Sequence, residues 1–507
     1  MLARVIQTKS TSTPTVNTTP VTTWPTAGIT NGNNNGLAQT VPVYADVQRI
    51  RYDASWVYIN SSGLASYTMG PFLTTGTGLF GFWPVSQNYT VKMPRTPGLV
   101  PAAKTPHAGG LIGMMVNGVG IYDLGDAFGF VQTGSAPVTG SDTMGQTNAT
   151  HPWWRDALAV EVVTFDPGFA HQPGINGQYH YHAEPKALRY QLGDNMQATY
   201  SGAPNNTYSY TEDTSNLHHS PILGWSYDGY PIYGPYAYSD PTTLGGTVTR
   251  MRSGFVLRNG LNGTTNITST GRTTLPKWAA IAEGLATLAN YSSQTLSNND
   301  FVLATASLYG PNTNYVNGPT TYSLGRYIGD YDFLGDRGQT QGPAGTFDLD
   351  QYNGRTCKTP EFPGGTYAYF VTINAAGTPA FPYMLGKQYY GTKTGTAQAV
   401  TVPASGVTEY FNAGGTNLAE TWSGSPVVNG GTGDVTITWS SVEGGTYKVE
   451  ASGNLSTWTT IAASVAAPAN TVLPAPASVI TQTSVVEGAA ALPANNMKRF
   501  YKITRNP

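Results

Sequence analysis

The chain gathers its few histidines in one region. All seven of them, in 507 residues, lie between His107 and His219. The stretch GQYHYHAEP contains two, His180 and His182, on either side of a tyrosine. On an extended strand, residues two apart project from the same face, about 6.6 Å apart along the chain, so both imidazoles can reach one metal ion. Glu184 follows at the same spacing and joins that face.

Further histidines flank this pair and could complete a site. His171 precedes His180 by nine residues, across the turn-like segment QPGING. His218 and His219 are adjacent, and only one of two adjacent residues on an extended backbone can face a given side. We predict that one of these two joins the His-x-His pair. His171 or Glu184 is a further candidate ligand.

The donor types favour copper first and zinc second, because imidazole suits both metals and thiols are nearly absent. Cys357 is the single cysteine, and with two histidines it would form a ligand set of the blue-copper type. An open zinc site would support hydrolysis with Glu184 or Asp228 as the base, whereas copper beside tyrosines would support oxidation. A closed site would only brace the fold. In the remaining alternative, the histidines and tyrosines bind no metal and only contribute to the packing of the protein.

Aspartates in a second region could hold calcium. They alternate in GDYDFLGDRG and follow in FDLD, which offers carboxylate oxygens within glycine-rich loops. The residues concerned are Asp330, Asp332, Asp336, Asp348 and Asp350. The alternative is a set of aspartates that hydrogen-bond within turns.

The elements that position these residues are predicted to be mainly strands. Charged residues make up 11% of the chain, while 60 glycines and 35 prolines suit short strands joined by tight turns. Residues 109–124 read as a hairpin around an Asn-Gly turn. Residues 157–166 and 366–373 read as buried strands. The fold class expected is all-β, with a large sandwich-type domain and a small C-terminal sandwich.

One helix is expected to interrupt the strands. Apolar residues recur at helical spacing in TTLPKWAAIAEGLATLANY, at Trp278, Ile281, Ala282, Leu285 and Leu288. Thr274 can cap this helix and Pro276 can occupy its first turn. An apolar stripe of this kind normally packs on a sheet.

Composition divides the chain into four parts. Residues 1–40 are rich in Thr, Pro and Asn and are expected to form a flexible segment. Residues 41–395 form the large domain, and residues 396–430 are expected to be a Gly/Thr-rich linker. Apolar and polar residues alternate along residues 431–507, and this pattern predicts a small antiparallel sandwich. Its expected core comprises Val435, Ile437, Trp439, Tyr447, Val449, Trp458 and Tyr501.

Several blocks are similar to the signature blocks of a known family. GQYHYH, HHSPILGWSYDGYPIYGPYAY, DLDQYNGRTCKTPEFPGGTYAYFVT and FPYMLG occur in the order seen in YHYH-domain proteins, and GLIGMMVNGVGIYD resembles a further region of that family. The resemblance covers most of residues 41–395 and implies a secreted or envelope-associated protein, without naming a substrate. Gln351 stands where the family pattern has an acidic residue, so no carboxylate acts there. WSSVEGGTYKVEASGNLSTWTTI resembles fibronectin type III-like modules, which bind surfaces or act as spacers.

The sequence also excludes several classes of function. A net charge of −2 argues against a nucleic-acid partner or a polybasic membrane-surface protein, and no apolar run is long enough to span a membrane. Phosphate-binding loops, dinucleotide fingerprints and the G-x-S-x-G motif are absent. We expect an extracellular metal-binding protein. The alternatives are a metal-dependent oxidoreductase or hydrolase acting on a carbohydrate or cell-surface polymer, and a structural surface or matrix protein.

Overall fold

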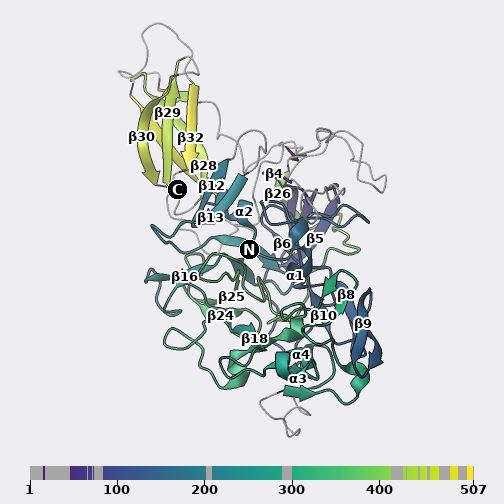
Figure 1. The fold of residues 1–507 in the computed structure, drawn as a ribbon. Helices are drawn as coiled ribbons and strands as arrows, with labels where there is room; N and C mark the ends of the chain where they lie inside the picture. Colours follow the sequence, from purple (N-terminus) through teal and green to yellow (C-terminus); the bar gives the residue numbers. More distant parts are fainter. Residues whose placement is uncertain are drawn as a thin grey trace.

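The fold was analysed in a computed structural model of the chain (Figure 1). It describes residues 15–16, 46–65, 67–70, 72, 84–200, 208–287, 300–412, 426–429, 431–442, 446–453, 457–466, 480–488 and 500–505. Strands dominate these residues, which confirms the predicted all-β class. No helix among them has the length and apolar character needed to cross a membrane. The predicted N-terminal segment 1–40 lies outside the described residues, apart from β1 (Thr15–Val16), which pairs with β4 (Thr68–Met69).

A seven-stranded mixed sheet forms the centre of the large domain. Its order is β11 (His180–Tyr181), β7 (Gly120–Tyr122), β6 (Leu111–Met115), β14 (Ile222–Ser226), β15 (Pro231–Tyr233), β25 (Thr366–Phe370) and β24 (Gly354–Cys357). The predicted hairpin at 109–124 is confirmed as β6 and β7. The predicted strand at 366–373 is confirmed as β25. The His-x-His segment therefore begins at an edge of this sheet, where β11 runs parallel to β7.

A second, antiparallel sheet shares its core with the first. Its order is β26 (Thr408–Asn412), β2 (Val47–Tyr52), β3 (Trp56–Ser61) and β5 (Tyr89–Pro94). One buried cluster contains Val47, Val57 and Val91 from this sheet, with Ile112, Trp225 and Ile232 from the seven-stranded sheet. The arrangement is that of a sandwich, in which two sheets bury one common core. Strand β26 lies within the segment 396–430 that was expected to be a linker.

A three-stranded sheet lies beside the histidine region. Its order is β10 (Trp154–Asp156), β8 (Gly125–Ser135) and β9 (Val138–Met144). Five two-stranded sheets complete the described part of the large domain, besides β1 with β4. They are β12 (Met196–Tyr200) with β13 (Tyr208–Glu212), β16 (Tyr236–Tyr238) with β17 (Val248–Arg250), β18 (Phe255–Leu257) with β23 (Tyr331–Phe333), β19 (Thr274–Pro276) with β20 (Asp300–Val302), and β21 (Val316–Asn317) with β22 (Thr320–Thr321).

The helices are short. In the described residues they are α1 (Ala157–Glu161), α2 (Lys186–Gln191), α3 (Ile267–Thr270) and α4 (Lys277–Ala282), with 3₁₀ turns at Val162–Thr164, Ala306–Leu308, Ile328–Asp330 and Leu334–Arg337. The predicted helix is present as α4, but it ends at Ala282, and Gly284 has a φ of 73°. Its N-cap position is Pro276, without a side-chain capping hydrogen bond, and the predicted cap Thr274 lies two residues earlier in β19. Leu288, the last residue of the predicted stripe, lies outside the described residues.

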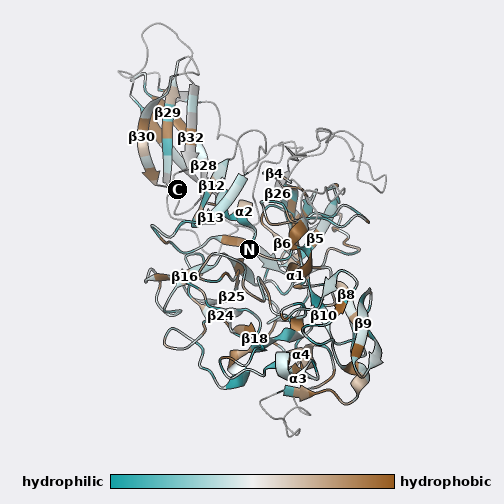
Figure 2. Cartoon of the chain, viewed as in Figure 1, coloured by the Kyte–Doolittle hydropathy of each residue, from teal (hydrophilic) through white to brown (hydrophobic). Residues whose placement is uncertain are grey.

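The C-terminal part forms a small unit of two sheets (Figure 1). One contains β27 (Val427–Val428), β28 (Val435–Val442) and β31 (Ile480–Glu487), and the other contains β30 (Thr459–Ala466), β29 (Thr446–Ser452) and β32 (Phe500–Arg505). Hydrophobic and hydrophilic residues alternate along β29 (Figure 2). The expected core forms as Val435, Ile437, Trp439, Tyr447 and Val449, with Tyr501 packed against it. Trp458 is only half-buried.

Candidate metal centre

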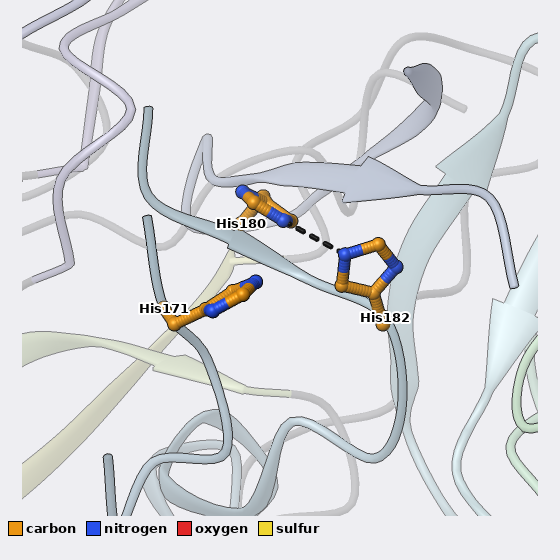
Figure 3. Close-up of side chains that lie close together, drawn as sticks. All are labelled: His171, His180 and His182. Carbon is orange, nitrogen blue, oxygen red and sulfur yellow. Dashed lines mark hydrogen bonds between the residues drawn. The ribbon is translucent and has the colours of Figure 1, made fainter. Parts of the chain in front are cut away.

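Strand pairing brings three of the seven histidines together (Figure 3). His171 and His180 face each other across a two-way backbone bridge, with N···O distances of 3.2 and 2.9 Å. His182 follows His180 at the spacing that returns a side chain to the same face. The ring centroids of His180 and His182 are 4.7 Å apart, and those of His171 and His180 are also 4.7 Å apart. The predicted convergence of His180 and His182 is therefore present, with His171 as the third member.

The tyrosines of the motif point to the opposite side. The hydroxyl of Tyr179 donates to Asp166 at 2.6 Å and lies 2.9 Å from that of Tyr67. The hydroxyl of Tyr181 lies 2.5 Å from the same Tyr67 oxygen. Both tyrosines are fully buried. The alternation thus separates a tyrosine cluster that fixes the strand from a histidine cluster that faces the other way.

Hydrogen bonds at the Nδ1 atoms fix the tautomer of each histidine. His180 Nδ1 lies 2.7 Å from the Gln178 carbonyl and His182 Nδ1 lies 2.6 Å from the Asp123 carbonyl, and a carbonyl can only accept. His171 Nδ1 lies 2.7 Å from Thr164 Oγ1, whose own proton goes to a carbonyl oxygen at 2.7 Å. All three rings therefore carry a proton at Nδ1. In the neutral form each has its lone pair at Nε2.

These lone pairs converge at the centre of the cluster. His180 Nε2 and His182 Nε2 are 2.9 Å apart, and the three histidines offer ligand atoms within 4.8 Å of one another. Glu161 adds a carboxylate, because its Oε2 lies 3.2 Å from His182 Nε2 and 3.4 Å from His171 Nε2. The arrangement offers three imidazole nitrogens and one carboxylate oxygen. The Nδ1 proton of each ring is hydrogen-bonded to an oxygen atom, as is usual for metal-binding histidines.

Glu161 was not predicted as a ligand, because residues 157–166 were expected to form a strand. That prediction is wrong: the segment forms α1, and Glu161 is its last residue. Asp156 caps the helix by accepting hydrogen bonds from the amides of Leu158 and Ala159, at 2.9 and 3.4 Å. An aspartate before an Ala-Leu-Ala run is a helix-start signal. The valines that follow favour strands, so a strand was predicted despite this signal.

Burial and the nearby carboxylate set the protonation of the cluster. Burial lowers the pKa of His180 well below its usual value, and the neighbouring His182 lowers it further. Burial also lowers the pKa of His171. Burial opposes the charged form of His182 as well, but hydrogen bonding and charge attraction from Glu161 outweigh it and raise its pKa. The pKa of Glu161, which burial would raise, is held well below its usual range by His171 and His182. The carboxylate is therefore ionised beside at least two neutral imidazoles.

Two histidines that were predicted as the third ligand lie elsewhere. His218 Nε2 lies 2.9 Å from the Gly193 carbonyl, and Asn195 holds the His218 backbone with hydrogen bonds of 2.9 and 2.8 Å. His219 Nδ1 lies 2.8 Å from the Ser220 carbonyl, and its ring packs against two tyrosines. Neither belongs to the cluster that the described residues form. His171 takes the position predicted for one of them.

The other candidate side chains also have separate environments. Glu184 pairs with Arg189, because β11 ends at Tyr181 and the alternation does not continue to position 184. Asp228 accepts hydrogen bonds from Tyr369 at 2.6 Å and from a backbone amide at 2.9 Å. Cys357 is buried in β24, and burial raises the pKa of its thiol. None of the three is part of the cluster among the described residues.

The five aspartates considered for calcium do not form a group of metal ligands in the described part of the chain. Four of them contact cationic side chains instead: Asp330 contacts Arg272, Asp332 contacts Arg258 and Arg337, Asp336 contacts Lys277, and Asp348 contacts Arg252. Asp350 accepts a hydrogen bond from Tyr367 at 2.9 Å. Arginine, lysine and tyrosine side chains therefore engage the carboxylate oxygens that calcium would need.

A cavity of about 880 Å³ opens beside the cluster. His171, His180, His182 and Glu161 all line it. Tyr122 forms part of the same wall and stacks on His180, with ring centroids 3.7 Å apart. The residues of the cluster therefore line a space that is large enough for a small molecule.

Comparison with known proteins identifies the family. A family model described as "YHYH protein" matches residues 90–384, which is more than half of the chain and includes all four residues of the cluster. Neither the curated proteins nor the solved structures include a match to this chain. The chain belongs to the YHYH protein family.

Proposed function

We propose that this protein binds one transition-metal ion through His171, His180 and His182, with Glu161 as a fourth ligand. Copper is the first candidate and zinc the second. The observation that carries the proposal is the convergence of three imidazoles whose Nδ1 atoms are all engaged by oxygen atoms. Hydrogen bonds of this kind orient the Nε2 lone pairs of metal-binding histidines.

Electrostatics supports the same conclusion. Two Nε2 lone pairs that face each other at 2.9 Å repel, so a proton or a cation must lie between them. The raised pKa of His182 allows a proton to take this place in the metal-free protein. A metal ion would displace that proton and would gain the Glu161 carboxylate as a ligand.

The order of copper before zinc rests on the donor types, because a site rich in imidazole and poor in thiols suits both metals. The 2.9 Å between the two Nε2 atoms is the length of a hydrogen bond in the metal-free protein.

The cavity favours a second candidate, a metal-dependent enzyme. A metal site that only stabilised the fold would have no access for a further molecule, whereas this cluster lines a cavity of about 880 Å³. Glu184 and Asp228 are not the base of such an enzyme, since both lie outside the cluster in the described residues. Glu161 and Tyr122 line the same cavity and are the candidates to assist such an enzyme.

The remaining parts of the proposal rest on composition and resemblance. We propose a secreted or envelope-associated location and a contact with a carbohydrate or cell-surface polymer. The C-terminal unit, with its two three-stranded sheets, is proposed to be a fibronectin type III-like spacer. The calcium hypothesis is not retained, because its aspartates contact arginine and lysine side chains.

The experiment is a metal titration of protein made without an affinity tag and stripped with a chelator. The parent protein and His218→Ala are expected to bind about one equivalent of Cu(II), because His218 contacts a backbone carbonyl outside the cluster. His182→Ala is expected to bind at least about 100-fold more weakly, since it loses a ligand rather than an outer contact. Full metal content in His182→Ala, or none in the parent, would overturn the proposal.

A further inference from the structure

We propose that the cavity beside the histidine cluster is a substrate pocket for a small, uncharged molecule with a planar apolar body and an oxygen donor group. The donor would reach the metal ion while the body fills the cavity. This inference rests on the metal binding proposed above. It adds to that proposal the chemical class of the molecule that the site admits.

The walls of the cavity are mainly apolar. Phe128, Trp154 and Tyr122 supply aromatic surface, and Ala108, Ala127 and several glycines leave room between them. Aromatic side chains bind planar apolar groups through their faces and edges. The volume of about 880 Å³ lies within the usual range for pockets that hold small molecules.

The rim carries two apolar side chains that face solvent. Met144 is 62% exposed and Ile175 is 73% exposed, and both line the cavity. Exposed apolar side chains of this size are common singly, but two that line one cavity offer apolar contacts to a molecule bound there. The lining also includes the three histidines and Glu161.

The walls of the cavity offer no cationic side chain to an anionic molecule. No lysine or arginine is among the described residues that line the cavity, while Asp126 and Glu161 both do. Arg155 is close, but it is engaged by Asp126 and lies over the Phe128 ring, 4.1 Å from its centroid. A phosphate or a carboxylate would find no cationic side chain to pair with, and only the metal ion would offset its charge.

Catechol is a suitable probe because it is planar, uncharged near pH 7 and has two oxygen donors. The comparison ligand is 3,4-dihydroxybenzoate, which carries the same two oxygen donors and an added carboxylate. Binding is measured by calorimetric titration of the zinc-loaded protein, since zinc does not oxidise either compound. We expect catechol to bind at least about tenfold more tightly than 3,4-dihydroxybenzoate.

A substitution within the cavity locates the binding. Ala127→Trp places a large ring at an exposed position of β8 that lines the cavity, and it should weaken catechol binding at least about tenfold. Thr133→Trp is the matched control, because Thr133 is exposed on the same strand but does not line the cavity. Both variants should still bind one equivalent of zinc.

The two proposals fail in different ways. A parent protein that binds metal but binds catechol no better than 3,4-dihydroxybenzoate, or an Ala127→Trp variant with unchanged catechol affinity, would overturn the pocket and leave the metal site standing. A parent protein that binds no metal would overturn both. The comparison of the two ligands on the parent protein remains decisive even if a variant does not fold.

Discussion

Replacing Thr164 by valine removes one hydroxyl group next to His171 and changes little else in volume. That hydroxyl donates to the Glu161 carbonyl at 2.7 Å and accepts from His171 Nδ1 at 2.7 Å. In Thr164→Val the Nδ1 proton is left without its acceptor inside a buried site. An unsatisfied buried donor costs about 1–3 kcal/mol, so the free energy of the folded protein is lower when the proton moves to Nε2. A proton at Nε2 occupies the lone pair that the metal requires.

The size of the effect follows from this change of tautomer. Loss of a hydrogen bond behind a metal-binding histidine usually weakens metal binding by about 10–100-fold, or about 1.4–2.7 kcal/mol. The assay is a competition titration against a chromophoric chelator, with Cu(II) and Zn(II) in separate experiments. Thr164→Ser is the matched control, since it keeps the hydroxyl and should bind within about threefold of the parent protein. Equal affinity of the valine variant, the serine variant and the parent would refute the assigned tautomer of His171.

Three further outcomes test the surroundings of the site. Burial raises the pKa of Asp156 to about 7, so between about pH 4 and 7 this carboxyl keeps its proton in the folded state and loses it in the unfolded state. Its contribution to the free energy of unfolding is therefore present at low pH and is lost as the pH rises to 7. Between pH 5 and 8, urea unfolding should show that the free energy of unfolding of the parent protein falls by on the order of 2 kcal/mol more than that of Asp156→Asn. Arg189→Met removes the cation that contacts three carboxylates and should lower the free energy of unfolding by about 3–5 kcal/mol, and calorimetry that finds no change would contradict this. Trp439→Ala should destabilise the C-terminal unit by about 3–5 kcal/mol while the metal content stays at the parent level, as parallel unfolding and metal titrations would show.

Local patterns were sufficient to predict part of the site. The period of two along a strand placed His180 and His182 on one face, and the structure has them there with the tyrosines opposite. The Asn-Gly turn likewise predicted the β6–β7 hairpin, against whose second strand β11 pairs. Both predictions succeed because they depend on neighbouring residues only.

The rest of the site depends on contacts that the sequence does not encode locally. His171 joins the cluster through a backbone bridge to His180, and nothing in its own segment distinguishes it from His219. Glu161 reaches the cluster only because α1 ends there, beside a chain segment ten residues further on. His218 is held away by Asn195, which is 23 residues distant in sequence. Such pairings follow from how the whole chain packs.

X-ray absorption spectroscopy of the Cu(II)-loaded protein tests the central claim most directly, because it counts the imidazole rings bound to the metal. The account predicts a shell of nitrogen and oxygen atoms at about 2.0 Å with outer-shell scattering from three imidazoles. His180→Ala should reduce that scattering to two rings. A spectrum of the parent protein with one imidazole or none would contradict the assignment of His171, His180 and His182 as the metal ligands.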